Sequence, residues 1–143
     1  MHRSQVRPLF GDVDPMNVVY YGNYLRFFEL GRAELMRSTG RPYSELAGQG
    51  LHLPVTEAGL RYHRPAMYDQ LLTVEASVAW VKKASLRFNY RILGPAGGGG
   101  GEVLLVTGFT VHGCVDSAGK IRPLPEWVPP LLARHLEDQS PAG

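Results

Sequence analysis

Apolar residues alternate with polar ones over three long segments in the second half of this 143-residue chain. The alternation runs through residues 71–81, 85–93 and 103–115. A period of two gives each segment one apolar and one polar face, which is the pattern of a half-buried strand. A short turn at 82–84 joins the first pair and a glycine run at 97–101 joins the second, so both connections are typical of hairpins. The chain is therefore expected to fold around an antiparallel sheet that is covered on one face.

One segment, residues 24–38, has helical spacing instead. Its apolar face is formed by Tyr24, Phe27, Phe28, Gly31 and Leu35. Gly40 and Pro42 follow it and predict its end. Asn23 is expected to cap its start by accepting a hydrogen bond from the first turn. Gly31 on the apolar face predicts that a strand packs too closely there to admit a side chain.

The remaining elements are shorter or less regular. A fifth, short strand is expected around residues 6–10, and a fourth long strand over 51–62, bent near Pro54. A second, weaker helix is expected from about 129 to 136, and the last residues, about 137–143, are expected to be disordered. The order is strand, long helix, then four strands. This order predicts an α+β arrangement of two layers in a single domain, residues 1–143.

Composition excludes several classes of protein. Lys plus Arg exceeds Asp plus Glu by only 2, too little for a general nucleic-acid binder. The sequence contains no run of 18 apolar residues, the length that a membrane-spanning helix needs. Residues 1–8 lack the apolar stretch of a signal peptide, so a cytoplasmic location is expected. Cys114 is the only cysteine, which excludes an internal disulfide, and the five histidines share no metal-ligand spacing, so no metal is expected.

The segment richest in chemistry is residues 10–24, FGDVDPMNVVYYGNY. In extended chain, Asp12 and Asp14 would project to the same side. The order Asp14-Pro15-Met16-Asn17 is also that of a type I turn. Two interpretations therefore stay open for Asp14, which either begins a turn and does nothing more or supplies a carboxylate for chemistry.

Two stretches resemble a known family. GDVDPMNVVYYGNYLRFFELGRAEL is similar to the signature of the 4-hydroxybenzoyl-CoA thioesterase-like branch of the hotdog-fold superfamily, which has Asp-x-Asp followed by aromatic-x-Asn-Tyr at the start of a long helix. PVTEAGLRYHRPAMYDQLLTVE resembles the family's second strand and the acidic turn after it. The resemblance implies a hotdog fold, a long central helix wrapped by a curved antiparallel sheet of about five strands. It also implies a homo-oligomer in which sheets pair edge to edge as dimers, often assembled into tetramers.

The resemblance also assigns roles in catalysis. The family's catalytic carboxylate falls on Asp14, which would act as nucleophile or general base. The backbone N–H of Tyr21 would polarise the thioester carbonyl at the positive end of the helix. Gly22 would allow a close approach of the ligand, although an ordinary turn glycine is an equal alternative. Asn17 stands where the family usually has glycine, and asparagine tolerates the left-handed backbone that glycine would adopt.

Further residues are candidates for binding the substrate. Val18 and Val19, with Phe28, would line an acyl pocket between subunits, and Glu57 would be a supporting residue across the dimer interface. Lys82 and Lys83 would hold the phosphates of coenzyme A, unless they are only solvated charges on a hairpin. Arg122 is a weaker candidate for the same role. Coenzyme A arrives as part of the substrate, and no other cofactor is expected.

The function expected from these residues is acyl-CoA thioester hydrolysis. A non-catalytic acyl-CoA or acyl-carrier-protein binding module on the same fold is the alternative. A hydratase is disfavoured because its sites usually need an Asp-His pair in another motif, and a serine hydrolase because no Gly-x-Ser-x-Gly elbow occurs. Glu29 is expected to be a solvated partner of nearby arginines, and Cys114 a buried structural thiol.

Overall fold

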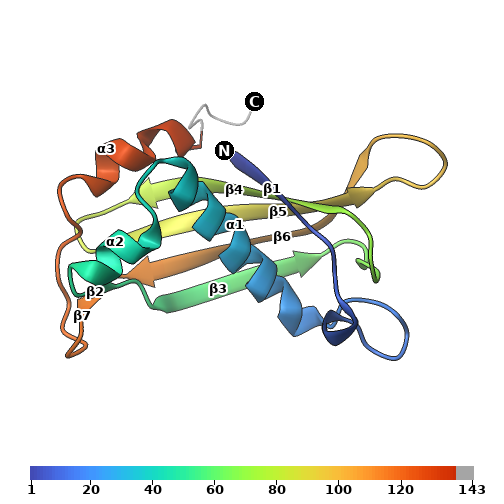
Figure 1. The fold of residues 1–143 in the computed structure, drawn as a ribbon, viewed down its shortest axis with the longest axis horizontal. Coiled ribbons are helices and arrows are strands. Elements are labelled where there is room, and N and C mark those ends of the chain that lie inside the picture. Colours follow the sequence, from blue (N-terminus) through green and yellow to red (C-terminus); the bar gives the residue numbers. More distant parts are fainter. Residues whose placement is uncertain (138–143) are drawn as a thin grey trace.

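A five-stranded antiparallel sheet and one long helix form the two layers of the molecule. The computed structural model describes residues 1–137. The strand order across the sheet is β1 (His2–Val6), β4 (Leu72–Val81), β5 (Ser85–Pro95), β6 (Glu102–Gly113) and β3 (Val55–Tyr62). Helix α1 (Tyr24–Ser38) lies across one face of this sheet (Figure 1). The expected α+β arrangement of one helix on five strands is confirmed.

The smaller elements lie beyond the two ends of α1. Near its end are α2 (Tyr43–Gly48), the two-stranded sheet of β2 (Leu51–His52) and β7 (Val115–Asp116), and α3 (Val128–Leu132), which continues into the 3-10 turn η3 (Ala133–His135). Near its start are the 3-10 turns η1 (Phe10–Asp12) and η2 (Tyr21–Asn23). Figure 1 shows these two groups at opposite ends of the sheet.

The apolar face of α1 forms the centre of the core, as its spacing predicts. Phe27, Phe28 and Leu35 are fully buried, and each such side chain contributes about 2 kcal/mol of hydrophobic stabilisation. The ring of Phe28 stacks on that of Tyr90 with centroids 4.3 Å apart. A Cβ atom at Gly31 would lie 2.7 Å from Cγ1 of Val74 on β4. The helix therefore packs against the strand at a distance that only glycine permits.

The first strand lies earlier than predicted. β1 covers His2–Val6 and pairs with β4, whereas the prediction placed a strand around 6–10. Pro8 has no N–H to donate to a ladder, and the chain after it turns into η1, where the Asp12 N–H donates to the carbonyl of Leu9 over 2.9 Å. The short strand exists, but the proline ends it instead of lying within it.

Two other predicted strands are each divided in two. The segment 51–62 breaks around Pro54 into β2 and β3, which belong to different sheets. The segment 103–115 divides in the same way at Cys114 into β6 and β7. These breaks create the small second sheet, which the alternation of residues does not predict.

The predictions for the helix ends also need correction. Helix α2 was not predicted, and the helix expected over 129–136 is the shorter α3 followed by η3. Asn23 does not cap α1, because its backbone is already helical and its side chain donates instead to the carbonyl of Asp12, 2.9 Å away. Residues 138–143, where disorder was expected, lie outside the described residues. Glu137 is ordered, with its carboxylate accepting hydrogen bonds from Ser77 and Asn89.

Candidate active site

The segment that carries the two aspartates forms a small hairpin just before α1. Val13 and Val19 make an antiparallel bridge, and the Asp14 N–H donates to the carbonyl of Val18 over 2.9 Å. Asn17 closes the hairpin with a left-handed backbone, φ +65°. Asparagine is one of the few residues other than glycine that adopts this conformation at low cost, so the loop forms without the glycine usual in the family.

Asp14 lies at the turn of this hairpin with one carboxylate oxygen engaged. Its Oδ1 accepts the N–H of Met16 at 2.8 Å and that of Val18 at 3.4 Å. Its Oδ2 accepts no hydrogen bond from any residue between 1 and 137. The turn that the residue order predicted is therefore present. It also holds the carboxylate in one orientation and leaves an oxygen free for chemistry.

Asp12, two residues earlier, has a different environment. It is buried, pairs with Arg26 on α1, and accepts the N–H of Leu9 at 2.7 Å. Asp12 lies in η1, so the extended chain that would project both aspartates to the same side is not present here. Asp12 fastens the hairpin to the helix, whereas the Asp14 carboxylate is held only by N–H groups of its own loop.

The turn η2 leads the chain from the hairpin into α1. The hydroxyl of Tyr62 on β3 donates to the carbonyl of Tyr21 over 3.2 Å, and Asn23 is held to Asp12 as described above. The N–H groups of Tyr21 and Gly22 donate to no acceptor within the described chain. Both residues are exposed, and their two unpartnered N–H groups lie just before the positive end of α1.

A small cavity of about 260 Å³ adjoins this turn. Its walls include Val19, Tyr21, Tyr24 and Tyr62. Val18 lies beside it, half-buried and bridged to Met67. These valines are therefore close to the carboxylate loop.

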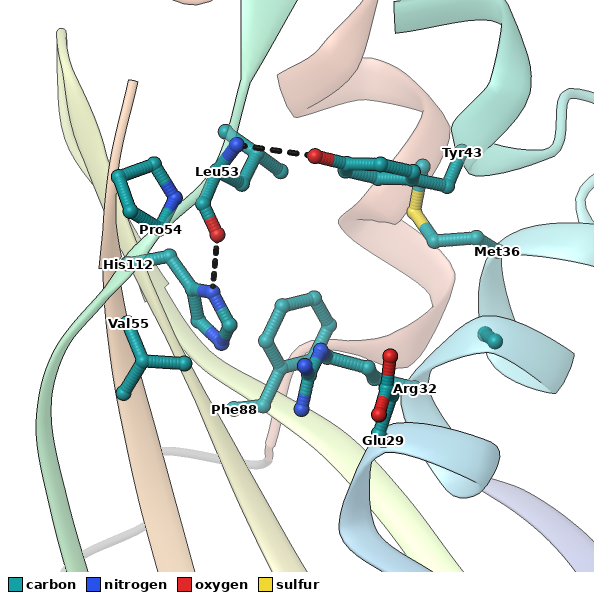
Figure 2. Close-up of a pocket in the computed structure, with 10 residues that line it drawn as sticks. Glu29, Arg32, Met36, Tyr43, Leu53, Pro54, Val55, Phe88 and His112 are labelled. Atoms are coloured by element: carbon teal, nitrogen blue, oxygen red, sulfur yellow. Dashed lines mark hydrogen bonds between the residues drawn. The ribbon is translucent and has the colours of Figure 1, made fainter. Parts of the chain in front are cut away.

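A larger cavity, of about 360 Å³, lies farther along α1 between the helix and the sheet (Figure 2). Apolar and polar side chains both line it: Glu29, Arg32, Ala33 and Met36 from α1, Tyr43 from α2, Leu53 to Val55 before and within β3, Phe88 from β5, and His112 from β6. Phe28, expected to line the acyl pocket, is buried in the core instead. The cavity was not predicted, because residues from five separate segments build it.

A chain of hydrogen bonds runs beneath this cavity. Buried His112 places Nδ1 2.9 Å from the carbonyl of Leu53 and Nε2 2.8 Å from Oγ1 of Thr110. The hydroxyls of Thr110 and Tyr90 are 2.6 Å apart, and Nη1 of Arg32 lies 3.5 Å from the Tyr90 oxygen. Burial lowers the pKa of His112 and raises that of Tyr90, so both are neutral at pH 7.

Three predicted binding residues lie away from both cavities. Glu57 pairs with Val111 in the β3–β6 ladder, on the sheet face opposite α1. Lys82 and Lys83 are exposed in the β4–β5 turn, with Nζ of Lys82 4.4 Å from the centre of the Trp80 ring. That turn is at the end of the sheet nearer the larger cavity, because β5 begins opposite the end of β6.

The remaining candidates have structural surroundings. Arg122 forms an ion pair with Asp116 at 2.9 Å, and Cys114 is buried. Glu29, expected to pair with arginines, lines the larger cavity and forms no ion pair within residues 1–137. Within residues 1–137, no group of three or more His, Cys, Asp or Glu side chains could hold a metal ion. None of the described helices is long and apolar enough to cross a membrane.

Comparison with known proteins gives a consistent family. A putative esterase of Aquifex aeolicus is 29% identical over 132 residues, covering 92% of this chain and 96% of its own. An acyl-CoA thioesterase of Haemophilus influenzae, YbgC, is 34% identical over 121 residues, covering 83% of each chain.

Solved structures agree with these relatives. A probable thioesterase from Bartonella henselae superimposes with a TM-score of 0.78 at 34% identity, over 87% of this chain and 98% of the other. A mutant 4-hydroxybenzoyl-CoA thioesterase in complex with 4-hydroxybenzoyl-CoA superimposes with a TM-score of 0.82 at 20% identity, over 92% of this chain and 97% of the other, which shows that the fold is shared. The family model of the thioesterase-like superfamily matches residues 8–132, and the chain therefore belongs to this superfamily of hotdog-fold proteins.

Proposed function

We propose that this thioester hydrolase cleaves acyl-CoA to a free carboxylic acid and coenzyme A, with Asp14 as its catalytic carboxylate. The observation that carries the proposal is how the two oxygens of that carboxylate are hydrogen-bonded. Backbone N–H groups hold Oδ1 in place, and Oδ2 is free, just before the two unengaged donors of η2. Named acyl-CoA thioesterases among the relatives supply the substrate class.

The geometry suits either of two routes. As general base, Oδ2 takes a proton from water while the water oxygen attacks the thioester carbon, the C–S bond breaks, and the leaving thiolate receives the proton. As nucleophile, Oδ2 attacks the carbon itself, and the C–S bond breaks to release the thiolate and leave a mixed anhydride. Water then hydrolyses the anhydride to the free acid and the Asp14 carboxylate, and the proton released goes to the thiolate. In both routes the N–H of Tyr21 would donate to the carbonyl oxygen as negative charge develops there. Such a donor contributes about 3 kcal/mol.

Within one chain, the catalytic loop and the larger cavity lie apart. Asp14 precedes the start of α1, whereas Arg32 lies eight residues into the helix from Tyr24, about 12 Å along its axis. The cavity is bordered by Val55 at the beginning of β3, and the catalytic turn by Tyr62 at the end of β3. The two parts of the site therefore lie at opposite ends of one strand.

That strand is the edge at which a second copy can bind. Within residues 1–137 no strand pairs with the outer side of β3, and its residues are mostly exposed. Two-fold antiparallel pairing of β3 with its copy would bring the Val55 end of one chain beside Tyr62 of the partner subunit. Each cavity would then meet the partner's catalytic turn, and two composite sites would form.

The charges on β3 fit such a dimer. A two-fold axis at Gly59 places Glu57 opposite Arg61 of the partner subunit, and neither residue has an ion-pair partner within the described chain. Opposite charges directly across a ladder contribute up to about 1 kcal/mol per pair. Glu57 would thus support the interface and not touch the substrate.

Two lysines are assigned to coenzyme A. Lys82 and Lys83, at the cavity end of the sheet, would attract the phosphates of coenzyme A. No cofactor is required beyond the coenzyme A carried by the substrate. A homotetramer and a cytoplasmic location stay predictions from the sequence.

The test is coenzyme A release from short, long and aromatic acyl-CoAs by the wild type and by Asp14→Asn. We expect at least a 100-fold loss of kcat in the variant, about 3 kcal/mol. Asp69→Asn is the control, because Asp69 is likewise an aspartate outside the helices and strands, it is exposed, and its left-handed backbone, φ +64°, suits asparagine. Equal activity in wild type and Asp14→Asn would refute the role of Asp14, and binding without turnover in the wild type would indicate a binding module.

A further inference from the structure

Tyr62 is the last residue of β3, and its side chain lies on the sheet face that α1 covers. It pairs with Val106 in the β3–β6 ladder, and Val106 is a fully buried core residue. Side chains directly opposite each other in a ladder lie on the same face of the sheet. The ring centre of Tyr62 is 5.5 Å from that of Tyr24, whose hydroxyl accepts the N–H of Ala66 at 3.1 Å. A residue that is itself fixed in the core therefore places the Tyr62 ring beside the start of α1.

The Tyr62 hydroxyl contacts one peptide unit of the catalytic turn. A carbonyl can only accept, so the hydroxyl donates its proton to the Tyr21 oxygen, 3.2 Å away. That oxygen belongs to the same peptide unit as the Gly22 N–H, and the peptide bond is trans. In a trans peptide the C=O and N–H bonds point in opposite directions. The hydrogen bond from Tyr62 therefore also fixes the direction of the Gly22 N–H, which points away from β3.

The preceding peptide unit is fixed by the backbone of the turn. The Tyr20 carbonyl accepts the N–H of Asn23 at 2.9 Å, which orients the Tyr21 N–H on the other side of that peptide. The Gly22 N–H is oriented from the sheet, by the side chain of Tyr62. A hydrogen bond on a carbonyl also polarises its peptide and strengthens the N–H as a donor. Tyr62 thus acts on both the direction and the strength of the Gly22 donor.

We propose that Tyr62 is a positioning residue for thioester hydrolysis, which holds the Gly22 N–H beside that of Tyr21 as a second donor to the carbonyl oxygen of the substrate. The inference rests on the proposed function, which places the thioester carbonyl at this turn. A carbonyl oxygen has two lone pairs, so it can accept both N–H groups as negative charge develops on it. The Tyr62 hydroxyl acts through Gly22 and does not touch the reacting atoms.

The first test is the rate of the chemical step in Tyr62→Phe, measured by single turnover with hexanoyl-CoA and benzoyl-CoA. The variant keeps the ring that contacts Tyr24 and removes only the hydroxyl. Because the Gly22 donor loses its fixed direction but is still present, we expect about a tenfold lower rate, less than the loss for a deleted donor. The Kd of the acyl-CoA and the free energy of unfolding should stay at their wild-type values.

Tyr68→Phe is the matched control for the loss of a hydroxyl. Tyr68 is a half-buried tyrosine whose ring stacks on Phe10 and whose hydroxyl forms no hydrogen bond within residues 1–137. Its variant should keep the wild-type rate. Sedimentation of both variants checks that their association state is that of the wild type, because Tyr62 lies at the end of the strand proposed to pair between subunits.

The carbonyl stretching band of the bound thioester reports polarisation directly. Under the proposed function Asp14→Asn binds acyl-CoA without hydrolysing it, so infrared spectra can be recorded with a carbon-13 label at the thioester carbonyl. Donors on the oxygen shift the band below its position in free substrate. Adding Tyr62→Phe should return the band by about half, because one of two donors loses its fixed direction. Adding Tyr68→Phe should not move it, and a purely structural role of Tyr62 would leave the band in place.

The outcomes keep this inference distinct from the proposed function. If Asp14→Asn remains as active as the wild type but Tyr62→Phe slows the chemical step at unchanged Kd, the inference stands and the role of Asp14 fails. If Asp14→Asn abolishes hydrolysis while Tyr62→Phe matches Tyr68→Phe in rate and band position, the inference fails and the proposed function stands. A weaker Kd at an unchanged rate in Tyr62→Phe would also overturn the inference, because the hydroxyl would then contact the substrate itself.

Discussion

The start and the middle of α1 handle polar groups in opposite ways. At its start, Asp14, Tyr21 and Gly22 are exposed or half-buried and keep unused hydrogen-bonding capacity. Along its middle, His112 and Thr110 are buried and both are hydrogen-bonded within the chain beneath the cavity. Under the proposed function, the groups that react are left open, whereas the groups that only shape a cavity are satisfied, because an unsatisfied buried polar group would destabilise the fold. Arg32 and Glu29, which also line the cavity, form no ion pair within residues 1–137.

The sharpest test within the first region is the contrast between its two aspartates. Asp14→Asn should abolish activity and leave the free energy of unfolding nearly unchanged, because its carboxylate binds only two amides of its own loop. Circular dichroism and denaturant titration check the second half of this statement. A large loss of stability in Asp14→Asn would mean that the residue is structural.

Asp12→Asn should show the converse. It breaks a pair between a buried carboxylate and the half-exposed Arg26, so we expect about 2 kcal/mol of destabilisation by denaturant titration. Activity measured well below the unfolding transition should fall far less than in Asp14→Asn. Equal losses of activity would show that the two aspartates act together.

The proposed dimer, in which the catalytic turn of one chain meets the cavity of the other across β3, predicts a smaller effect for a charge reversal on that strand. Arg61→Glu would place like charges opposite Glu57 at two symmetric positions and weaken the dimer by about 2 kcal/mol, a shift that sedimentation can measure. Activity at low protein concentration should fall with it. The double variant Glu57→Arg with Arg61→Glu should restore both, and failure to restore them would contradict the register.

Buried His112, beneath the cavity, predicts that the free energy of unfolding depends modestly on pH. Because burial lowers the folded-state pKa of His112, the unfolded chain takes up a proton first as the pH falls through its ordinary value near 6.5. Stability is therefore fully present above that pH and declines below it, by at most about 1.4 kcal/mol per pH unit for this group. Unfolding at pH 7.5 and 5.5 should show a smaller decline in His112→Gln than in the wild type. His135, whose pKa burial also lowers, keeps its own contribution in both proteins.

Sequence predicts those features that depend on neighbours in the chain. Helix α1 has the bounds its spacing indicates, and Gly31 meets β4 as its place on the apolar face requires. The misplaced first strand could also have been found locally, since Pro8 cannot continue a ladder. Asn23 could not, because its partner, the carbonyl of Asp12, becomes available only when the hairpin folds back on the helix.

The candidate site also has one part that could be predicted from neighbouring residues and one part that could not. The Asp14 turn and the left-handed Asn17 follow from a few consecutive residues, so the loop was predictable. The larger cavity was not, because Arg32 and His112 are eighty residues apart in sequence and meet only through the sheet order. His112 gives no usable signal either, because the alternation places Val111 on the apolar face of that strand, whereas the fold buries His112 and Thr110.

The measurement that tests the composite site most directly is subunit complementation. Asp14→Asn lacks the carboxylate, and Ala33→Phe fills the cavity from α1 while keeping the carboxylate; folding of each is checked by circular dichroism. Each variant alone should be inactive. Co-refolded in equal amounts, half of the dimers would be mixed, each with one intact site, so about a quarter of wild-type activity should return. No recovery in mixtures shown to contain mixed dimers would contradict a site shared between two chains.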